Sequence, residues 1–252
     1  MSDPDNQKPT SISATVQYPK RFYDKVTLEN SDGGFLITLD GKPIKTPLKQ
    51  DLSVPALNLG EAIAEEWRSQ KDHIIVESMI LTKLANTAID RTFKLKNEIV
   101  DEIVNYAASD LICYRAECPL ELTELQASKW DPVLQWLKDE QNVELSTAAG
   151  IIHQAQAPEE LLKLKRLFEG FNEYSLTAIH NMTTICGSAI LTLALVRGRE
   201  QIGEIWSIAH IDEDYQIKRW GEDGEASERR RNRWLEFEQT YHFYGLVGTA
   251  PY

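Results

Sequence analysis

The residue types best suited to chemistry gather in one stretch, residues 212–225. Its carboxylates, its amide and one large aromatic are the groups with which proteins recognise other molecules. The stretch contains neither a nucleophile with a paired base nor a set of metal ligands, so it favours binding over catalysis. The candidate partner-binding residues are Asp212, Glu213, Gln216, Trp220, Glu222, Asp223 and Glu225.

Helical spacing allows a second interpretation of this stretch. Four polar residues at positions i, i+4, i+7 and i+11 would share one helix face: Asp212, Gln216, Arg219 and Asp223. Such a face is often only solvated, and a Glu225–Arg229 pair four residues apart would stabilise it. The density of acids around Trp220 favours recognition, while the solvated face remains the alternative.

A second polar group surrounds Asp110 and Arg115, in the segment 109–117. These two side chains could line a pocket and form a second binding patch. Alternatively, Asp110 caps the end of a helix and Arg115 pairs with a carboxylate, which is the commoner use of such residues.

Signatures of known catalytic and cofactor sites are absent from the sequence. The cysteines, Cys113, Cys118 and Cys186, have no paired imidazole in any recognisable motif, and no second cysteine pair completes a zinc site. Neither glycine-rich phosphate-binding motif is present. We therefore expect a non-enzymatic protein with no metal and no cofactor.

The composition narrows the class of partner. The chain has 252 residues, 42% of them hydrophobic, and a net charge of −12. This charge disfavours nucleic acid and anionic membranes, whereas a basic or partly apolar protein surface would suit it. Three cysteines suit a reducing compartment, and residues 1–20 read as a disordered tail without a signal or transit peptide. We expect a bacterial cytoplasmic protein, with an oligomeric state that the residues do not determine.

The periodicity predicts an α+β fold that positions these residues. Turn signals between short β-forming runs indicate a small β-sheet domain over 21–55. From 56 to 252, apolar spacing of three and four residues predicts a larger helical domain of six or more helices. Within it we expect a helix opening at Asp131–Pro132, one central buried helix over 176–196, and a final helix with an apolar aromatic stripe. That stripe consists of Trp234, Phe237, Tyr241 and Tyr244.

Several segments together resemble one known family. They are RFY (21–23), LDGKPIKTP (39–47), LTKLANTAIDR (81–91), SDLICYRAE (109–117), WDP (130–132) and DEDYQIKRWGE (212–222). In this order, and across most of the chain, they resemble the ATP12 family, the assembly chaperones of the F1 sector of ATP synthase. The resemblance implies a β domain followed by a helical domain, and a client, the F1 α subunit, bound before it meets β. It also implies an important glutamate in the acidic segment, either Glu213 or Glu222.

Two hypotheses from different classes therefore stand. The first is a chaperone that covers an apolar subunit interface of the F1 α subunit. The second is a small-molecule enzyme with an acidic cleft formed by Asp110, Arg115 and residues 212–225. The chaperone hypothesis accounts for the missing catalytic motifs, and the enzyme hypothesis requires a constellation that the sequence does not display.

Overall fold

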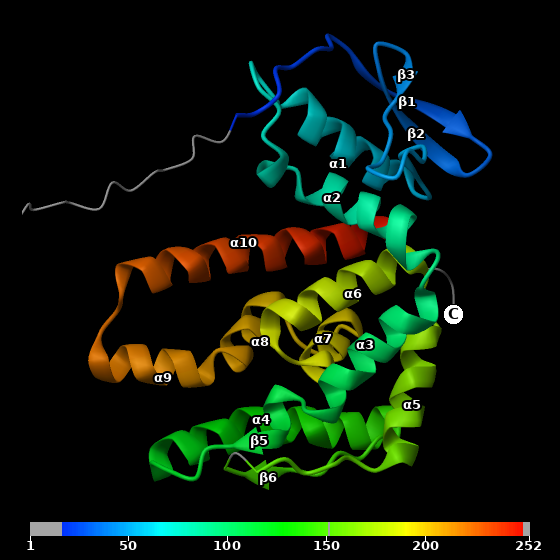
Figure 1. Ribbon diagram of the computed structural model, residues 1–252. Helices are drawn as coiled ribbons and strands as arrows, with labels where there is room; N and C mark the ends of the chain where they lie inside the picture. The colour runs from blue at the N-terminus through cyan, green and yellow to red at the C-terminus, as the bar shows by residue number, and fades with distance from the viewer. Residues whose placement is uncertain (1–16, 151, 249–252) are drawn as a thin grey trace, which may run out of the picture.

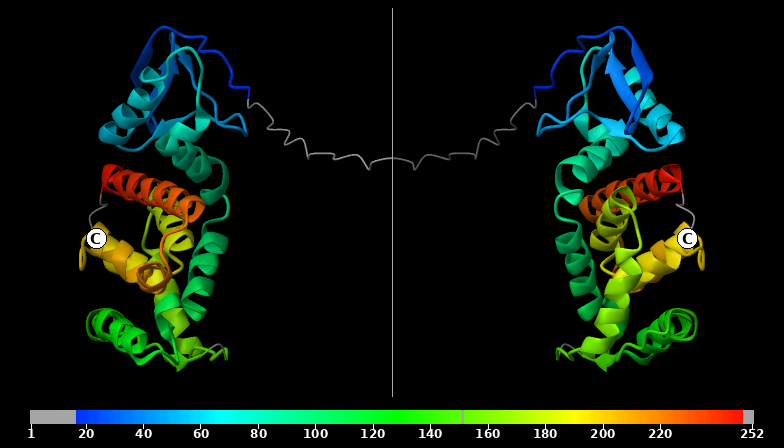
Figure 2. Two further views of the ribbon diagram at one scale, coloured as in Figure 1. Left: turned by 90° about the vertical axis from the view of Figure 1, so that its left-hand side faces the viewer. Right: turned by 90° about the vertical axis from the view of Figure 1, so that its right-hand side faces the viewer.

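The N-terminal strands form a small antiparallel sheet at one end of an elongated molecule (Figures 1 and 2). Strands β1 (Val26–Ser31) and β2 (Gly34–Leu39) pair in register through a tight turn, and β2 also pairs with β3 (Lys42–Pro43) and β4 (Ser53–Val54). The computed structural model describes residues 17–150 and 152–248. Most of the predicted N-terminal tail, residues 1–16, therefore lies outside the described residues, whereas Lys20 forms a bridge with His73.

One face of this sheet is covered by the first helix, α1 (Leu57–Arg68). Leu59 and Ile63 are fully buried, as the spacing of their apolar side chains predicts. Gly60 lets the helix approach the sheet closely, because a Cβ there would lie 3.1 Å from the Leu28 side chain. The sheet thus shares its core with a helix that follows residue 55.

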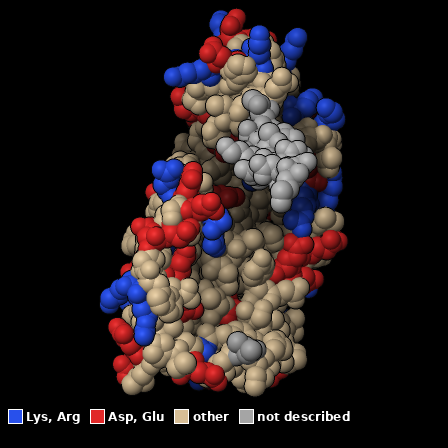
Figure 3. Space-filling view, turned by 60° about the vertical axis from the view of Figure 1, so that its left-hand side comes forward, with Lys and Arg blue, Asp and Glu red and all other residues tan. Residues whose placement is uncertain are grey.

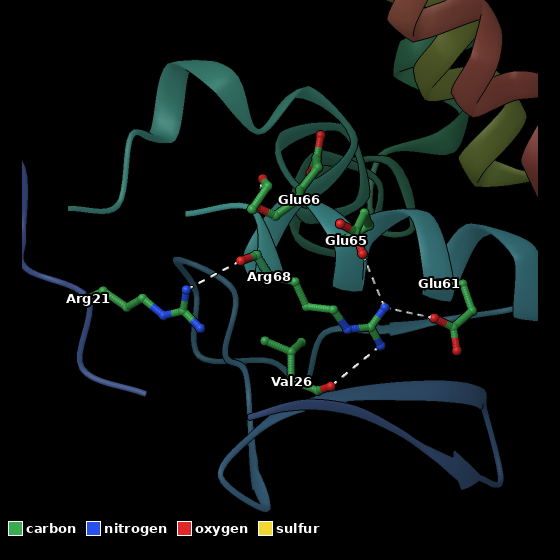
Figure 4. A network of polar contacts seen from close by, with 7 residues as sticks. Arg21, Val26, Glu61, Glu65, Glu66 and Arg68 are labelled. Atoms are coloured by element: carbon green, nitrogen blue, oxygen red, sulfur yellow. Dashed lines mark hydrogen bonds and ion pairs between the residues drawn. The ribbon is translucent and has the colours of Figure 1, made fainter. Parts of the chain in front are cut away.

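The carboxyl end of α1 is held by the segment that precedes β1 (Figure 4). The Arg21 guanidinium donates to the carbonyls of Tyr23 at 3.0 Å and Arg68 at 3.3 Å, and also to that of Gln70. The Tyr23 hydroxyl donates to the Trp67 carbonyl at 2.7 Å. Because the last carbonyls of a helix have no partner within it, these donors fix the first segment of the chain onto α1.

Arg21→Ala is expected to lower the free energy of unfolding by about 1–2 kcal/mol, since it removes several charge-assisted hydrogen bonds to carbonyls. Arg21→Lys should recover only a small part of this loss, because an ammonium cannot reproduce the planar fork of donors. Urea unfolding of the two variants measures the effect. A full recovery by lysine would show that charge alone matters at this position.

Most of the remaining chain is helical, which confirms the α+β fold with a larger helical part. The elements that follow α1 are η1 (Val76–Ser78), α2 (Ile80–Thr87), a π-helical turn η2 (Ala88–Thr92), α3 (Lys96–Ala108), η3 (Leu111–Cys113), α4 (Leu120–Gln141), α5 (Pro158–Glu169), α6 (Glu173–Cys186), α7 (Ala189–Val196), α8 (Ile202–Ala209), α9 (Ile211–Trp220) and α10 (Gly224–Val247). Two short strands, β5 (Tyr114–Arg115) and β6 (Ala148–Ala149), pair in parallel beside α4. Among the described residues, no helix combines the length and apolar character needed to cross a membrane.

Two helix boundaries differ from the sequence predictions. Pro132 does not open a helix but lies inside α4, which begins twelve residues earlier at Leu120. Proline is tolerated there on an exposed face, where its carbonyl accepts a hydrogen bond from Arg199 Nη2 at 2.7 Å. The predicted single helix over 176–196 is two helices, because Gly187 adopts a positive φ of 73° that ends α6. The Ser188 hydroxyl then caps α7 by accepting from Leu191 N.

The final helix packs into the core in part as predicted. Phe237 is fully buried, while Trp234, Tyr241 and Tyr244 are half-buried against the core. Phe243, which the predicted stripe omits, is also fully buried. Helix α10 packs against α6 and also contacts α2 and α1, so it lies between the N-terminal sheet with its helices and the rest of the helical part (Figure 1).

Candidate functional site

The predicted binding stretch folds into a helical hairpin instead of one continuous helix. Helix α9 ends at Trp220 because Gly221 takes a positive φ of 90°, and α10 begins at Gly224 after three intervening residues. The Asp223 carboxylate caps α10 by accepting from Ala226 N at 2.9 Å. The predicted polar face is therefore wrong at its far end, since Asp223 belongs to the start of the next helix.

The hairpin encloses a hollow of about 300 Å³, which we call the α9–α10 hollow. Five predicted binding residues line it: Glu213, Gln216, Trp220, Glu222 and Asp223. The lining is completed by five residues that the sequence does not single out as binding residues: Ile217, Gly221, Ala226, Ser227 and Arg230. Arg230 stands in the arginine-rich run directly after the acidic stretch, and that proximity is the signal by which it could have been found.

Trp220 has the most exposed indole ring of this hairpin. Its side chain is 73% exposed, although burying a tryptophan is strongly favourable. Glu222 and Asp223, which follow after Gly221, are also exposed. An exposed aromatic side chain beside a hollow with carboxylates at its edge is typical of the centre of a protein interface.

The charges of the hollow do not cancel. Arg230 is already paired with Asp214 of α9, so it ties the two helices together and offers little free positive charge. The carboxylates of Glu213, Glu222 and Asp223 remain at the edge of the hollow. Burial lowers the pKa of His210, at the start of α9, so its imidazole is neutral at pH 7. The hollow is therefore acidic, and it suits a basic or amide-bearing partner.

Two contacts hold α9 on the rest of the molecule. Asp212 does not line the hollow; its carboxylate accepts from Gln126 Nε2 of α4 at 2.6 Å. The Tyr215 hydroxyl donates to Glu121, also on α4, at 3.4 Å. Gln126 is buried and also accepts from Ala116 N, so this one amide joins three segments. Asp212 thus positions α9, and Glu225 is exposed in the first turn of α10 outside the hollow.

Helix α10 is fixed from the opposite side. The Arg233 guanidinium donates to the Ile185 carbonyl near the end of α6. The Trp234 ring packs edge-on against Trp206 of α8, with centroids 5.2 Å apart. These contacts on both helices hold the hairpin in place. Figure 3 shows the molecule with the left-hand side of Figure 1 turned forward; charged side chains gather on both sides of a hollowed strip that is mostly uncharged.

The predicted second patch is wrong in its Asp110 member, because Asp110 is fully buried. Its carboxylate accepts from Ser188 Oγ at 2.6 Å, Ile190 N at 3.1 Å and Ile112 N at 3.3 Å. It therefore joins the end of α3 to the α6–α7 junction, which agrees with the capping alternative. Burial raises the pKa of this carboxyl to about 6.

Arg115 is likewise turned inward. Its side chain is only 11% exposed; Nη2 lies 2.8 Å from Asp131 of α4, and the guanidinium lies 5.0 Å from the centre of the Trp130 ring. Neither Arg115 nor Asp110 lines the α9–α10 hollow, so the acidic cleft required by the enzyme hypothesis does not form. Among residues 17–150 and 152–248, no three His, Cys, Asp or Glu side chains are grouped to hold a metal ion.

Comparison with known proteins places the chain in a family. The profile of the family described as ATP12 chaperone protein matches residues 20–138. Atp12 from Paracoccus denitrificans has the same fold, with a TM-score of 0.86 and 35% sequence identity over 91% of this chain and 99% of that one. The Atu1473 protein of Agrobacterium tumefaciens gives a TM-score of 0.88 and 36% identity over 91% and 87%. Protein atp12, mitochondrial, of Schizosaccharomyces pombe is 26% identical over 233 residues, 87% of this chain and 80% of its own length. The chain belongs to the ATP12 chaperone family.

Proposed function

We propose that this protein is a chaperone for assembly of the F1 sector of ATP synthase, and that it holds the F1 α subunit before that subunit pairs with β. The observation that carries the proposal is the exposed Trp220 ring beside an acidic hollow on a firmly supported hairpin. Assembly chaperones must cover apolar surface that the finished complex buries, and an exposed aromatic anchor serves that purpose.

Further apolar side chains extend this surface. Leu120 and Leu125 are exposed at the start of α4. The same end of α4 is hydrogen-bonded to α9 through Glu121 and Gln126. Together with Trp220 they provide separate apolar contacts around the acidic hollow. A client segment that alternates apolar and basic side chains would match both features.

The proposed setting is the cytoplasm of a bacterium. The two bacterial structures match at 35% and 36% identity, above the 26% of the mitochondrial relative. The three cysteines, Cys113, Cys118 and Cys186, are all unpaired, which suits a reducing compartment.

Trp220→Ala tests the function directly. Loss of an aromatic anchor at an interface centre costs about 2 kcal/mol, roughly a thirtyfold weaker affinity. We expect that loss when binding to isolated F1 α subunit is measured by biolayer interferometry. The melting temperature should remain within a degree or so, because the ring contributes little to the core.

Phe22→Ala is the matched control, because Phe22 is an equally exposed aromatic, at 72%, in the N-terminal segment. It should bind the α subunit as the parent protein does. Equal weakening by both substitutions would mean that exposed aromatics act nonspecifically. Unchanged binding by Trp220→Ala would remove the α9–α10 hollow as the client site.

A further inference from the structure

A second hollow, of about 230 Å³, lies between α2 and α6; we call it the α2–α6 hollow. Its floor contains the apolar side chains of Leu84 and Ile99. Its polar lining includes Lys83, Arg91, His180, Asn181 and Thr184. None of these residues lines the α9–α10 hollow, and the client site proposed above makes no use of them.

A local widening of the helix places its two cationic side chains, Lys83 and Arg91, on the same side. In a regular α-helix, Lys83 and Arg91 would be rotated about 80° apart around the axis, because eight residues are not a whole number of turns. Here the helix widens into the π-helical turn at 88–92, where Phe93 N bonds to Ala88 O at 3.0 Å. Each residue of the wider turn rotates the chain less, which offsets the 80° between the two side chains, and both Lys83 and Arg91 line the same hollow. Such π-turns recur at functional sites.

Both cations keep donors for a ligand. Arg91 uses only Nη2 for Glu102, at 2.6 and 2.9 Å, and no described residue pairs with its Nε or Nη1. The contact of Lys83 Nζ within the described residues is a long one, 3.9 Å from Glu236. Glu102 and Glu236 do not line the hollow, but they balance the charges of Arg91 and Lys83. A ligand would therefore be held by the N–H donors that these two carboxylates leave free, and not by a net positive charge.

The histidine adds neither charge nor a free donor to the hollow. His180 Nε2 lies 2.8 Å from Glu102, and burial lowers the pKa of its imidazole, which is therefore neutral at pH 7. With Nε2–H donating to Glu102, Nδ1 carries no proton and cannot donate to an oxyanion, so the donors for such a ligand must come from Lys83 and Arg91. Asn181 donates through Nδ2 to Glu236 at 3.3 Å, and its amide oxygen is unused within the described residues.

We propose that the α2–α6 hollow binds one oxyanion, a carboxylate or a phosphate group, held by Lys83 and Arg91. A guanidinium presents paired donors that match the oxygens of either group, and an ammonium supplies a compact second charge. The volume accommodates a single such group and its immediate attachment. The site is independent of the client site, because the two hollows have different walls.

The test is an NMR titration of the full-length protein at constant ionic strength, first with inorganic phosphate and then with glutarate. The readouts are the His180 ring and Arg91 Nε–H resonances, which adjoin the site. We expect saturable shifts with a millimolar dissociation constant for at least one anion. The anion with the lower dissociation constant shows whether the site prefers a phosphate group or a carboxylate. Lys83→Met should weaken binding about tenfold, and Arg91→Met should abolish saturation.

Lys129→Met is the matched control, because Lys129 is an exposed lysine that pairs with Glu204 on another face. Its titration should coincide with that of the parent protein. The proposal is overturned if neither anion saturates the signals. It is equally overturned if Lys129→Met weakens binding as much as Lys83→Met, since the anion would then respond only to net charge.

Discussion

Charge reversal in the α9–α10 hollow, by Glu213→Lys or Glu222→Lys, is expected to abolish protection of the F1 α subunit while leaving the fold intact. Both carboxylates line the hollow, and the cation that lines it with them, Arg230, is already paired with Asp214. A basic client group would then meet a lysine instead of a carboxylate, and such like-charge contacts cost several kcal/mol. Glu222 is exposed, so its replacement should change stability by no more than about 1 kcal/mol.

The measurement is the aggregation of isolated F1 α subunit at rising temperature, with each variant present. Circular dichroism and the melting temperature report whether the variant itself is folded. Glu140→Lys supplies the control, because Glu140 is an exposed acid near the far end of α4 and should protect the client fully. If both hollow variants protect as well as Glu140→Lys does, the acidic stretch is only a solvated face.

The sequence predicts the residue types of this site but not their arrangement in space. Acids, an amide and a tryptophan within eleven residues indicate recognition chemistry, and five of the seven chosen residues line one hollow. Their three-dimensional arrangement depends on Gly221, whose positive φ separates α9 from α10. A glycine inside an otherwise helical pattern permits this turn without requiring it. The sequence pattern predicts one continuous polar face, and the backbone angle of Gly221 divides it between two helices.

Tertiary contacts account for the other differences. The sequence places Asp212 beside the predicted binding residues, but its hydrogen-bond partner is Gln126, 86 positions away. Pro132 resembles the first residue of a helix, but it lies inside α4, where its exposed position leaves the carbonyl that lacks an N–H partner open to water. Gly187 and Ser188 divide the apolar run into α6 and α7 because Ser188 has a buried acceptor, Asp110, which periodicity does not reveal.

Asp110 itself should make stability depend on pH. Burial raises the pKa of its carboxyl from 3.8 to about 6, so between these values the folded protein holds a proton that the unfolded chain has released. Its contribution to the free energy of unfolding is therefore fully present below pH 3.8 and is lost as pH rises through 6. This difference in pKa corresponds to about 3 kcal/mol.

Asp110→Asn isolates that contribution, because asparagine does not titrate. Urea unfolding of the parent protein and the variant between pH 4 and pH 7 should show the parent's advantage shrinking by about 3 kcal/mol as pH rises. The difference between the two proteins cancels the other titrating groups, which they share. A constant difference across this range would mean that the carboxyl keeps its unfolded pKa, stabilised as an anion by its three donors.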